Sequence, residues 1–288
     1  MRTCTFLALL LLFIFTPGFG MAAEETSTRL PNEKAVSING SMGELYCLLA
    51  LPDLPENGQC PMVVLSHGFK GNLNYPLWPP IIQALNAHGI GTLRFDFNGA
   101  GKSAGEFVNM TVPNEIDDLL NVIAWVRKQP FTKNISLVGH SQGGVVSGMA
   151  AGECGAGQIA TLVLLSAAAV LRDDALRGNT QGTTYDPWHL DKPWYLLAGK
   201  LHLGRAYIQT AMNLPIYETT AKYTGPALIL NGMADVVVPY TYAERYKQAM
   251  PQAELVIVPG ENHSWSENPH YAVKLVSDWL IKHLGEDR

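Results

Sequence analysis

The chain has 288 residues, of which 47% are apolar, so it can bury a large core and fits one α/β domain better than two smaller domains. Its formal net charge is −5, without a basic or acidic block. This balance argues against a nucleic-acid-binding protein and against a polybasic contact with a membrane surface, and it is compatible with a small neutral or acidic substrate.

The first residues have the pattern of a secretory signal peptide. Arg2 precedes an unbroken apolar run from Phe6 to Phe15, and small residues follow before Ala23. We expect residues 1–22 to be removed, which leaves residues 23–288 as an exported domain, periplasmic or secreted, without a membrane span. An uncleaved anchor is the alternative, although the run is short for a bilayer.

Three cysteines remain after that cleavage, namely Cys47, Cys60 and Cys154. Their odd number and irregular spacing predict neither a disulfide framework nor a metal site. Buried, inert thiols are expected for Cys47 and Cys154. One bridge between Cys47 and Cys60 stays open for an oxidising compartment.

Strand and helix patterns alternate along the rest of the chain. The predicted strands are residues 35–39, 44–51, 62–66, 92–97, 135–139, 161–166, 227–231 and 254–258, and the predicted helices include 78–88, 114–128 and 271–284. The first two strands are joined by Gly40–Gly43, which is typical of a hairpin. The alternation predicts an α/β fold with a mostly parallel sheet and helices on both faces.

One interval breaks this alternation, because residues 169–227 carry no strong strand pattern. A structureless loop of that length is improbable in a compact domain, so we expect a small inserted subdomain at about 170–225. Its aromatic residues favour a lid over the site, although aromatics that only pack the insertion are the alternative. These residues are Tyr185, Trp188, Trp194, Tyr195, Tyr207 and Tyr217.

The chemistry centres on Ser141, in the sequence Gly-His-Ser-Gln-Gly of residues 139–143. The motif follows a predicted buried strand and opens a helix of small residues, which is the context of a nucleophile elbow. Such a turn exposes the serine above the carboxyl edge of the sheet, at a helix N-terminus. We therefore predict that Ser141 is a catalytic nucleophile.

A serine nucleophile needs a base, and the base needs a group that orients it. Behind an elbow of this type the acid and then the histidine follow the serine in the chain. Asp235 and His263 lie just after two successive strands, at the carboxyl edge where such sites assemble. We predict them as the acid and the base; Glu261 is a rival acid but is too near His263 in sequence.

Two backbone N–H groups are expected to form an oxyanion hole. One belongs to Gln142, directly after the nucleophile. The other is expected from Phe69, in the loop His67-Gly68-Phe69-Lys70-Gly71 that follows a buried strand. His67 and His140 are interpreted as structural residues.

No cofactor is predicted. The sequence Gly99-Ala100-Gly101-Lys102-Ser103 resembles phosphate-binding loops, but a P-loop needs glycine where Asp96 stands, and no helix opens at once. Asp96 and this turn are expected to support the site structurally. No spacing of His, Cys or acidic residues suggests a metal.

With these motifs in place, the chain resembles the bacterial cinnamoyl (feruloyl) esterases of the α/β-hydrolase superfamily. The resemblance covers nearly all of the mature chain and is carried by residues 67–72, 94–103 and 139–144, and more specifically by residues 174–182, Tyr207 and residues 214–218 of the insertion. It implies a small α/β lid. It also implies that Asp174 and Tyr207 bind the phenolic hydroxyl of a cinnamoyl group, with Gln181 nearby.

The expected function is hydrolysis of a hydroxycinnamate ester through an acyl-enzyme on the serine. The expected partner is a small aromatic ester, for which plant cell walls are one source. A general short-chain carboxylesterase or acyltransferase is the alternative. The sequence leaves monomer and homodimer open. The exported form departs from family members, which are often intracellular.

Overall fold

A computed structural model describes residues 29–197 and 201–285 of the chain. The predicted signal peptide, residues 1–22, lies outside the described residues. An eight-stranded sheet forms the centre, in the order β1-β2-β4-β3-β5-β6-β11-β12. Its strands are β1 (Glu33–Gly40), β2 (Gly43–Ala50), β3 (Cys60–Ser66), β4 (Gly91–Phe95), β5 (Thr132–His140), β6 (Leu162–Leu165), β11 (Ala227–Gly232) and β12 (Glu254–Val258).

The pairing of these strands is mostly parallel. β1 and β2 form the predicted antiparallel hairpin and β2 pairs antiparallel with β4, whereas every neighbouring pair from β4 to β12 is parallel. Within β3, Val63 and Leu65 pack into one apolar layer, and Met62 and Val64 pack into the opposite layer. A strand that is apolar on both sides needs a cover on both faces of the sheet.

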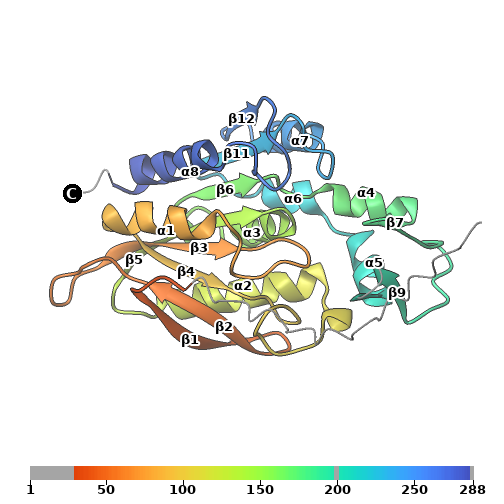
Figure 1. Cartoon of the computed structure of the whole chain (residues 1–288), viewed down its shortest axis with the longest axis horizontal. Helices are drawn as coiled ribbons and strands as arrows, with labels where there is room; N and C mark the ends of the chain where they lie inside the picture. The colour runs from red at the N-terminus through yellow and green to blue at the C-terminus, as the bar shows by residue number, and fades with distance from the viewer. Residues whose placement is uncertain (1–28, 198–200, 286–288) are drawn as a thin grey trace, which may run out of the picture.

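Helices provide that cover (Figure 1). Helices α1 (Trp78–Ala87) and α8 (Pro269–Leu284) pack on one face, and α2 (Val112–Arg127), α3 (Gln142–Cys154) and α7 (Thr241–Ala249) pack on the other. The side chains of Thr111 and Asn268 accept backbone N–H bonds at the starts of α2 and α8, which fixes where these helices begin. The predicted fold class is confirmed.

The interval predicted as a lid, residues 170–225, runs between β6 and β11, and much of it gathers at one end of the molecule, at the right in Figure 1. It contains α4 (Val170–Arg177), β7 (Asn179–Thr180), β8 (Thr183–Thr184), β9 (Trp194–Leu197), β10 (Leu201–Gly204), α5 (Arg205–Ala211) and α6 (Ile216–Thr220). β10 packs against the short 3-10 helix η1 (Phe107–Asn109), so the lid contacts the core domain. Strands of two to four residues are too short to show an alternating pattern in the sequence.

The cysteines of the described chain are free. Cys47 lies on β2 and Cys60 on β3, and β4 separates these two strands in the sheet. Burial raises the pKa of both thiols, most strongly that of Cys47. The two side chains therefore serve as unreactive apolar core groups in this structure.

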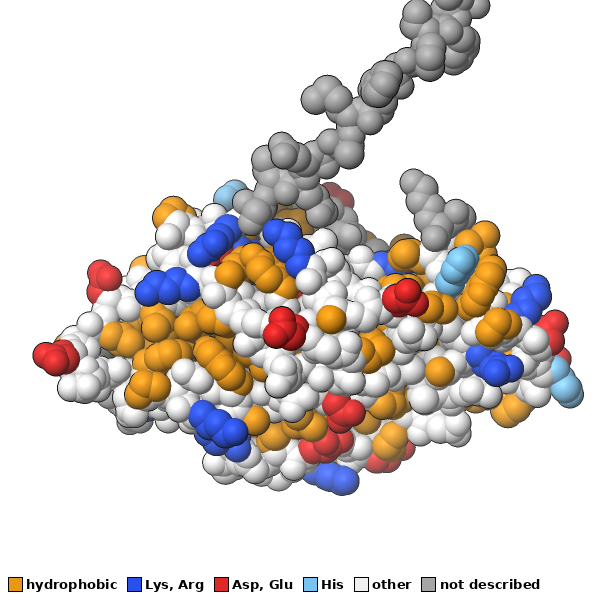
Figure 2. All heavy atoms as spheres, turned by 90° about the horizontal axis from the view of Figure 1, so that it is seen from below, with side chains coloured by type: hydrophobic (Ala, Val, Ile, Leu, Met, Phe, Trp, Pro, Cys, Tyr) orange, Lys and Arg blue, Asp and Glu red, His pale blue; other side chains and the backbone are white. Residues whose placement is uncertain are grey.

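The surface carries mixed charge. On the face in Figure 2, basic and acidic side chains are both spread over the molecule, with apolar side chains between them. This agrees with the absence of a charged block in the sequence. Among the described helices, none has the length and apolar character that a bilayer crossing requires.

Candidate active site

The turn between β5 and α3 holds Ser141 in a strained backbone conformation, with φ 56° and ψ −122°. Gly139 and Gly143, two residues before and two residues after Ser141, have no room for a side chain. A Cβ on Gly139 would lie 2.1 Å from the carbonyl oxygen of Gly143, and a Cβ on Gly143 would lie 2.3 Å from the carbonyl oxygen of His67. The sharp turn thus forms only with glycine at both positions, as the nucleophile-elbow motif predicts.

The structure brings the three predicted triad residues together. His263 Nε2 lies 3.0 Å from Ser141 Oγ, and His263 Nδ1 lies 2.8 Å from Asp235 Oδ2. Asp235 and His263 come from the loops after β11 and β12, at the same edge of the sheet as the elbow. An imidazole held between a serine hydroxyl and a buried carboxylate can take the hydroxyl proton.

The carboxylate of Asp235 is itself fixed. Its Oδ1 accepts the backbone N–H groups of Val237, at 2.9 Å, and Val238, at 2.7 Å, so only Oδ2 faces His263. The rival acid, Glu261, instead accepts backbone N–H groups from Asn262, Glu267 and Asn268. Glu261 therefore anchors the loop that carries His263.

The two other histidines near the serine are structural, as interpreted from the sequence. His140 donates from Nε2 to the carbonyl oxygen of His263 at 3.0 Å and stacks on Tyr75. Burial lowers the pKa of His140 to about 3. His67 Nε2 accepts the backbone N–H of Phe97 at 3.1 Å, and burial lowers the pKa of His67 too. Both rings are neutral and hold loops in place.

The expected oxyanion donors flank the serine. Gln142 is the first residue of α3, and Phe69 lies in the loop after β3. Among the described residues, neither backbone N–H has a hydrogen-bond acceptor. A Cβ on Gly68 would lie 2.8 Å from the Cβ of Ser141, so glycine allows this loop to approach the serine. Two unpartnered N–H groups beside a serine can bind a developing oxyanion.

Two cavities meet at Ser141. The narrow cavity has a volume of about 40 Å³ and reaches under the lid. Its lining residues are Phe69, Ser141, Gln142, Ala168, Val170, Leu171, Asp174, Thr180, Gln181, Tyr207, Val237 and Val238. The three residues predicted to bind substrate, Asp174, Tyr207 and Gln181, are thus gathered at one cavity beside the serine.

A buried chain of hydrogen bonds runs behind the narrow cavity. Tyr207 donates its hydroxyl proton to Gln142 Oε1 at 2.7 Å, and Gln142 Nε2 donates to Glu115 Oε2 at 2.8 Å. All three side chains are buried. Because its proton is committed to Gln142, the Tyr207 hydroxyl presents only acceptor lone pairs to a ligand. Asp174 also accepts, and one of its oxygens is held by Arg177 at 2.6 Å.

Burial raises the pKa of Glu115 from 4.5 to about 8, against the opposing hydrogen bond from Gln142. The folded protein therefore holds this proton more tightly than the unfolded chain. The resulting stabilisation is complete below the unfolded value of 4.5 and is lost as the pH rises to about 8.

Glu115→Gln should flatten this pH dependence, since a glutamine cannot ionise. We expect the unfolding free energy of the wild type, relative to the variant, to fall by on the order of a few kcal/mol across that window. Thermal unfolding of both proteins across the same pH range measures the difference. Parallel melting curves would show that Glu115 does not titrate in the folded protein.

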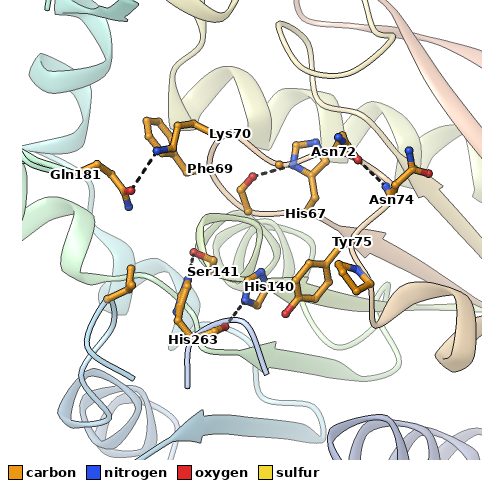
Figure 3. A pocket seen from close by; sticks show the side chains of 14 residues that line it. His67, Phe69, Lys70, Asn72, Asn74, Tyr75, His140, Ser141, Gln181 and His263 are labelled. Atoms are coloured by element: carbon orange, nitrogen blue, oxygen red, sulfur yellow. Dashed lines mark hydrogen bonds between the residues drawn. The ribbon is translucent and has the colours of Figure 1, made fainter. Parts of the chain in front are cut away.

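The wide cavity, with a volume of about 480 Å³, shares Ser141 with the narrow cavity and is shown in Figure 3. Its polar side chains include Lys70, Asn72, Asn74, Tyr75 and Gln181. Lys70 and Gln181 point toward each other across it, with Nζ 3.4 Å from Oε1. Gln181 thus lines both cavities.

The phosphate-loop resemblance has a structural explanation. Asp96 accepts the backbone N–H groups of Leu73, at 2.6 Å, and Lys102, at 2.8 Å, and so ties the glycine turn to the loop after β3. A Cβ on Gly101 would lie 2.1 Å from the Asp96 carboxylate. Within the described residues, no group of three or more His, Cys, Asp or Glu side chains could hold a metal ion.

Residues 63–275 of the chain match the sequence model of the alpha/beta hydrolase family. The chain belongs to the alpha/beta hydrolase family. In its structure this hydrolase is similar to the ferulic acid complex of Est1E from Butyrivibrio proteoclasticus, with a TM-score of 0.80 and 28% identity, over 87% of this chain and 100% of that chain.

Two relatives found by sequence match either a short part of the chain or a longer part at lower identity. An uncharacterized 31.7 kDa protein of Escherichia coli is 37% identical over 94 residues, which span 32% of each chain. The mitochondrial palmitoyl-protein thioesterase ABHD10 of Mus musculus is 24% identical over 233 residues, which span 78% of this hydrolase and 77% of the mouse protein.

Sequence reasoning missed several residues of the site. Glu115 lies three residues after Val112 and four before Leu119, on the buried face of α2, so an acid on an apolar helix face was the available signal. Val237 lines both cavities but has no distinctive pattern of its own. The contact between Lys70 and Gln181 joins residues 111 positions apart and leaves no local trace in the sequence.

Proposed function

We propose that this hydrolase is a serine esterase that cleaves hydroxycinnamate esters. The observation that carries the proposal is the hydrogen-bonded series of Ser141, His263 and Asp235 at the mouth of a cavity lined by Asp174 and Tyr207. The similarity to Est1E, which has been solved with ferulic acid, supports the choice of acyl group.

The reaction follows from the arrangement of the side chains. Ser141 Oγ attacks the ester carbonyl carbon while its proton passes to His263 Nε2, and Asp235 stabilises the imidazolium. The N–H groups of Phe69 and Gln142 bind the oxyanion. The bond from carbon to the alcohol oxygen then breaks and His263 protonates the departing alcohol. Water, deprotonated by His263, then attacks the acyl carbon, the bond from carbon to Ser141 Oγ breaks, and His263 returns the proton to Oγ.

The acceptors of the narrow cavity suit a phenol. Tyr207 offers lone pairs, and Asp174 offers the carboxylate oxygen that Arg177 leaves free. A phenolic O–H supplies one donor, which either of these acceptors can take, whereas an unpaired polar end would be costly to bury. The cavity is narrow, at about 40 Å³, so the proposal includes an outward movement of side chains at its rim when the cinnamoyl ring binds.

Hydrolysis rates decide the acyl class. Methyl ferulate, methyl p-coumarate and methyl caffeate should be cleaved with higher kcat/KM than methyl cinnamate, which lacks the phenolic hydroxyl. Aliphatic p-nitrophenyl esters of rising chain length complete the panel. Equal rates for methyl ferulate and methyl cinnamate would remove the basis for phenol recognition.

A general short-chain carboxylesterase is the second candidate. The small size of the narrow cavity, about 40 Å³, favours it, because a short acyl group needs less room than an aromatic ring. The same panel separates the two, since a short-chain enzyme would prefer p-nitrophenyl acetate and show little activity on every cinnamoyl ester.

Tyr207→Phe should lower kcat/KM on methyl ferulate by about 2- to 12-fold, the equivalent of one neutral hydrogen bond. Asp174→Asn should cost more, since it removes a charged acceptor. Steady-state kinetics on methyl ferulate and p-nitrophenyl acetate measure both variants. Equal losses on the two esters would mean that Tyr207 acts through Gln142 on the oxyanion hole rather than on the phenol.

Export of the protein is also proposed, on the basis of the apolar run in residues 1–22. Expression in a bacterial host with intact-mass analysis of the extracytoplasmic fraction should give a chain that begins near Ala23. Recovery of the full-length chain from the cytosol would contradict export.

A further inference from the structure

The wide cavity has a charge that the proposed acyl chemistry does not use. Lys70 is exposed at its rim, and the other lining residues supply neutral amides, aromatic rings and backbone. Among the described residues that line it, none is Asp or Glu, and Lys70 makes no ion pair. The Lys70 ammonium, which lies 5.8 Å from the centre of the Phe69 ring, is thus the one Lys or Arg charge among the described lining residues, in a protein whose net charge is −5.

The backbone holds Lys70 in a conformation that glycine adopts more easily. The turn from Gly68 to Gly71 is closed by a hydrogen bond of 2.9 Å between the Gly71 N–H and the Gly68 carbonyl oxygen. Lys70 stands at the third position of this turn with φ +58°. Glycine or asparagine is usual at such a position, so lysine there points to a use of its side chain.

On the lid, Gln181 faces Lys70 across the wide cavity, and it too stands in a tight turn with positive φ. The hairpin of β7 and β8 turns through Gln181 and Gly182, both with positive φ, which is the two-residue loop of a tight hairpin. This turn places Gln181 in the lining of both cavities, with its Oε1 3.4 Å from Lys70 Nζ. Neither this neutral amide oxygen nor the Phe69 ring, whose centre lies 5.8 Å from Nζ, brings a negative charge to pair with Lys70.

We propose that the wide cavity binds the alcohol part of the ester, and that Lys70 selects alcohols that carry a carboxylate, that is, hydroxy acids. This inference rests on the proposed ester hydrolysis at Ser141. Because the acyl group occupies the narrow cavity, the alcohol oxygen of the bound ester projects into the wide cavity, beside His263, which protonates it.

The dimensions and lining of the cavity fit this class. A volume of about 480 Å³ accommodates a ring-sized polyhydroxylated group. Asn72 and Asn74 lie along its wall, and Tyr75 is held by its stacking on His140, at 4.2 Å between ring centres. Amide groups and an aromatic face suit hydroxyl groups and the carbon skeleton between them, while the ammonium suits the carboxylate.

The test uses two substrates of nearly the same shape, the ferulate esters of glycolic acid, which is anionic, and of glycolamide, which is neutral. The ratio of their kcat/KM values is measured for the wild type and for Lys70→Gln. The two esters can differ in intrinsic reactivity, but that difference does not depend on the enzyme. It therefore cancels when the ratio for a variant is divided by the ratio for the wild type. We expect Lys70→Gln to lower the ratio of glycolate to glycolamide ester by about 3- to 10-fold.

Two further variants isolate the cause. Lys70→Arg should keep the ratio within about twofold of the wild type because the charge is retained. Lys222→Gln removes an equal charge from an exposed residue outside both cavities and should leave the ratio unchanged. About 1 M salt should shrink the wild-type ratio toward that of Lys70→Gln, since it screens partly exposed charges.

An unchanged ratio in Lys70→Gln would overturn the inference, as would equal falls in Lys70→Gln and Lys222→Gln or a full loss in Lys70→Arg. Equal losses on both esters would assign Lys70 to support of the oxyanion loop instead. The same pair made as acetate esters separates the two proposals. A Lys70-dependent ratio on acetates without any preference for ferulate would keep the alcohol site and reject the cinnamoyl class.

Discussion

Ser141→Ala is expected to lower kcat for ester hydrolysis by about 10⁶-fold. The variant keeps the oxyanion donors and the cavities but lacks the oxygen that attacks the ester. His263, which lies 3.0 Å from Ser141 Oγ, then has no hydroxyl to activate. The residual rate, measured with methyl ferulate or p-nitrophenyl acetate at high enzyme concentration, reports what binding and the oxyanion hole contribute alone.

A matched control comes from the same helix. Ser147 lies in α3 with a buried hydroxyl that has no hydrogen-bond partner among the described residues. Ser147→Ala removes the same atom type and should keep activity within a few fold. Both variants should have melting temperatures near that of the wild type. A Ser141→Ala protein with a tenth of the wild-type activity would refute the nucleophile assignment.

Asp235→Asn should lower kcat by about 10⁴-fold, although it changes a single atom. Asp235 Oδ1 accepts two backbone N–H groups, so the asparagine must keep its oxygen there and turn its NH₂ toward His263. His263 Nδ1 then accepts a hydrogen bond from that NH₂ instead of donating one to a carboxylate. The ring is held with its proton on Nε2, where it cannot take the proton of the serine.

Glu261→Gln is the control for this acid. Glu261 anchors backbone N–H groups of the loop after β12 and lies close to His263 in sequence. We expect Glu261→Gln to lower the melting temperature, because an amide holds the backbone N–H groups of this loop less strongly than a carboxylate does. We expect kcat to stay within about tenfold of the wild type, since the side-chain hydrogen bonds of Glu261 among the described residues go to this loop and not to the His263 ring. A larger kcat loss in Glu261→Gln than in Asp235→Asn would exchange the roles of the two acids.

The sheet and the elbow could be predicted because their signals are local. β3 is a continuous apolar run, the strand before Ser141 ends in a glycine motif, and Asp235 and His263 each follow a strand of their own. Parallel strands place their carboxyl ends at one edge, so the order along the chain was enough to bring the triad together.

The lid and the environment of the site could not be read in the same way. Strands of two residues such as β7 show no period, and the hydrogen bond from Tyr207 to Gln142 joins residues 65 positions apart. The resemblance to a family indicated Tyr207 as a ligand of the phenol. The structure adds that its proton is already donated to Gln142, so its role toward a ligand is that of an acceptor.

The role proposed for Lys70 also could not be predicted from the sequence around it. Its neighbours in sequence identified an oxyanion loop, and nothing local marked the lysine itself. Its significance comes from the positive φ of the turn, the hairpin that places Gln181 opposite, and the absence of acids among the described lining residues. These are properties of the assembled cavity.

The most direct measurement for the central claim is labelling with an alkyl fluorophosphonate, which forms a stable bond to an activated serine. The adduct is located by peptide mass spectrometry, and hydrolysis of methyl ferulate is followed in the same samples. The triad at Ser141 predicts one adduct, on Ser141, with activity falling in proportion to its occupancy, and slower labelling in the presence of ferulate. Full occupancy of Ser141 with methyl ferulate hydrolysis unchanged would contradict it.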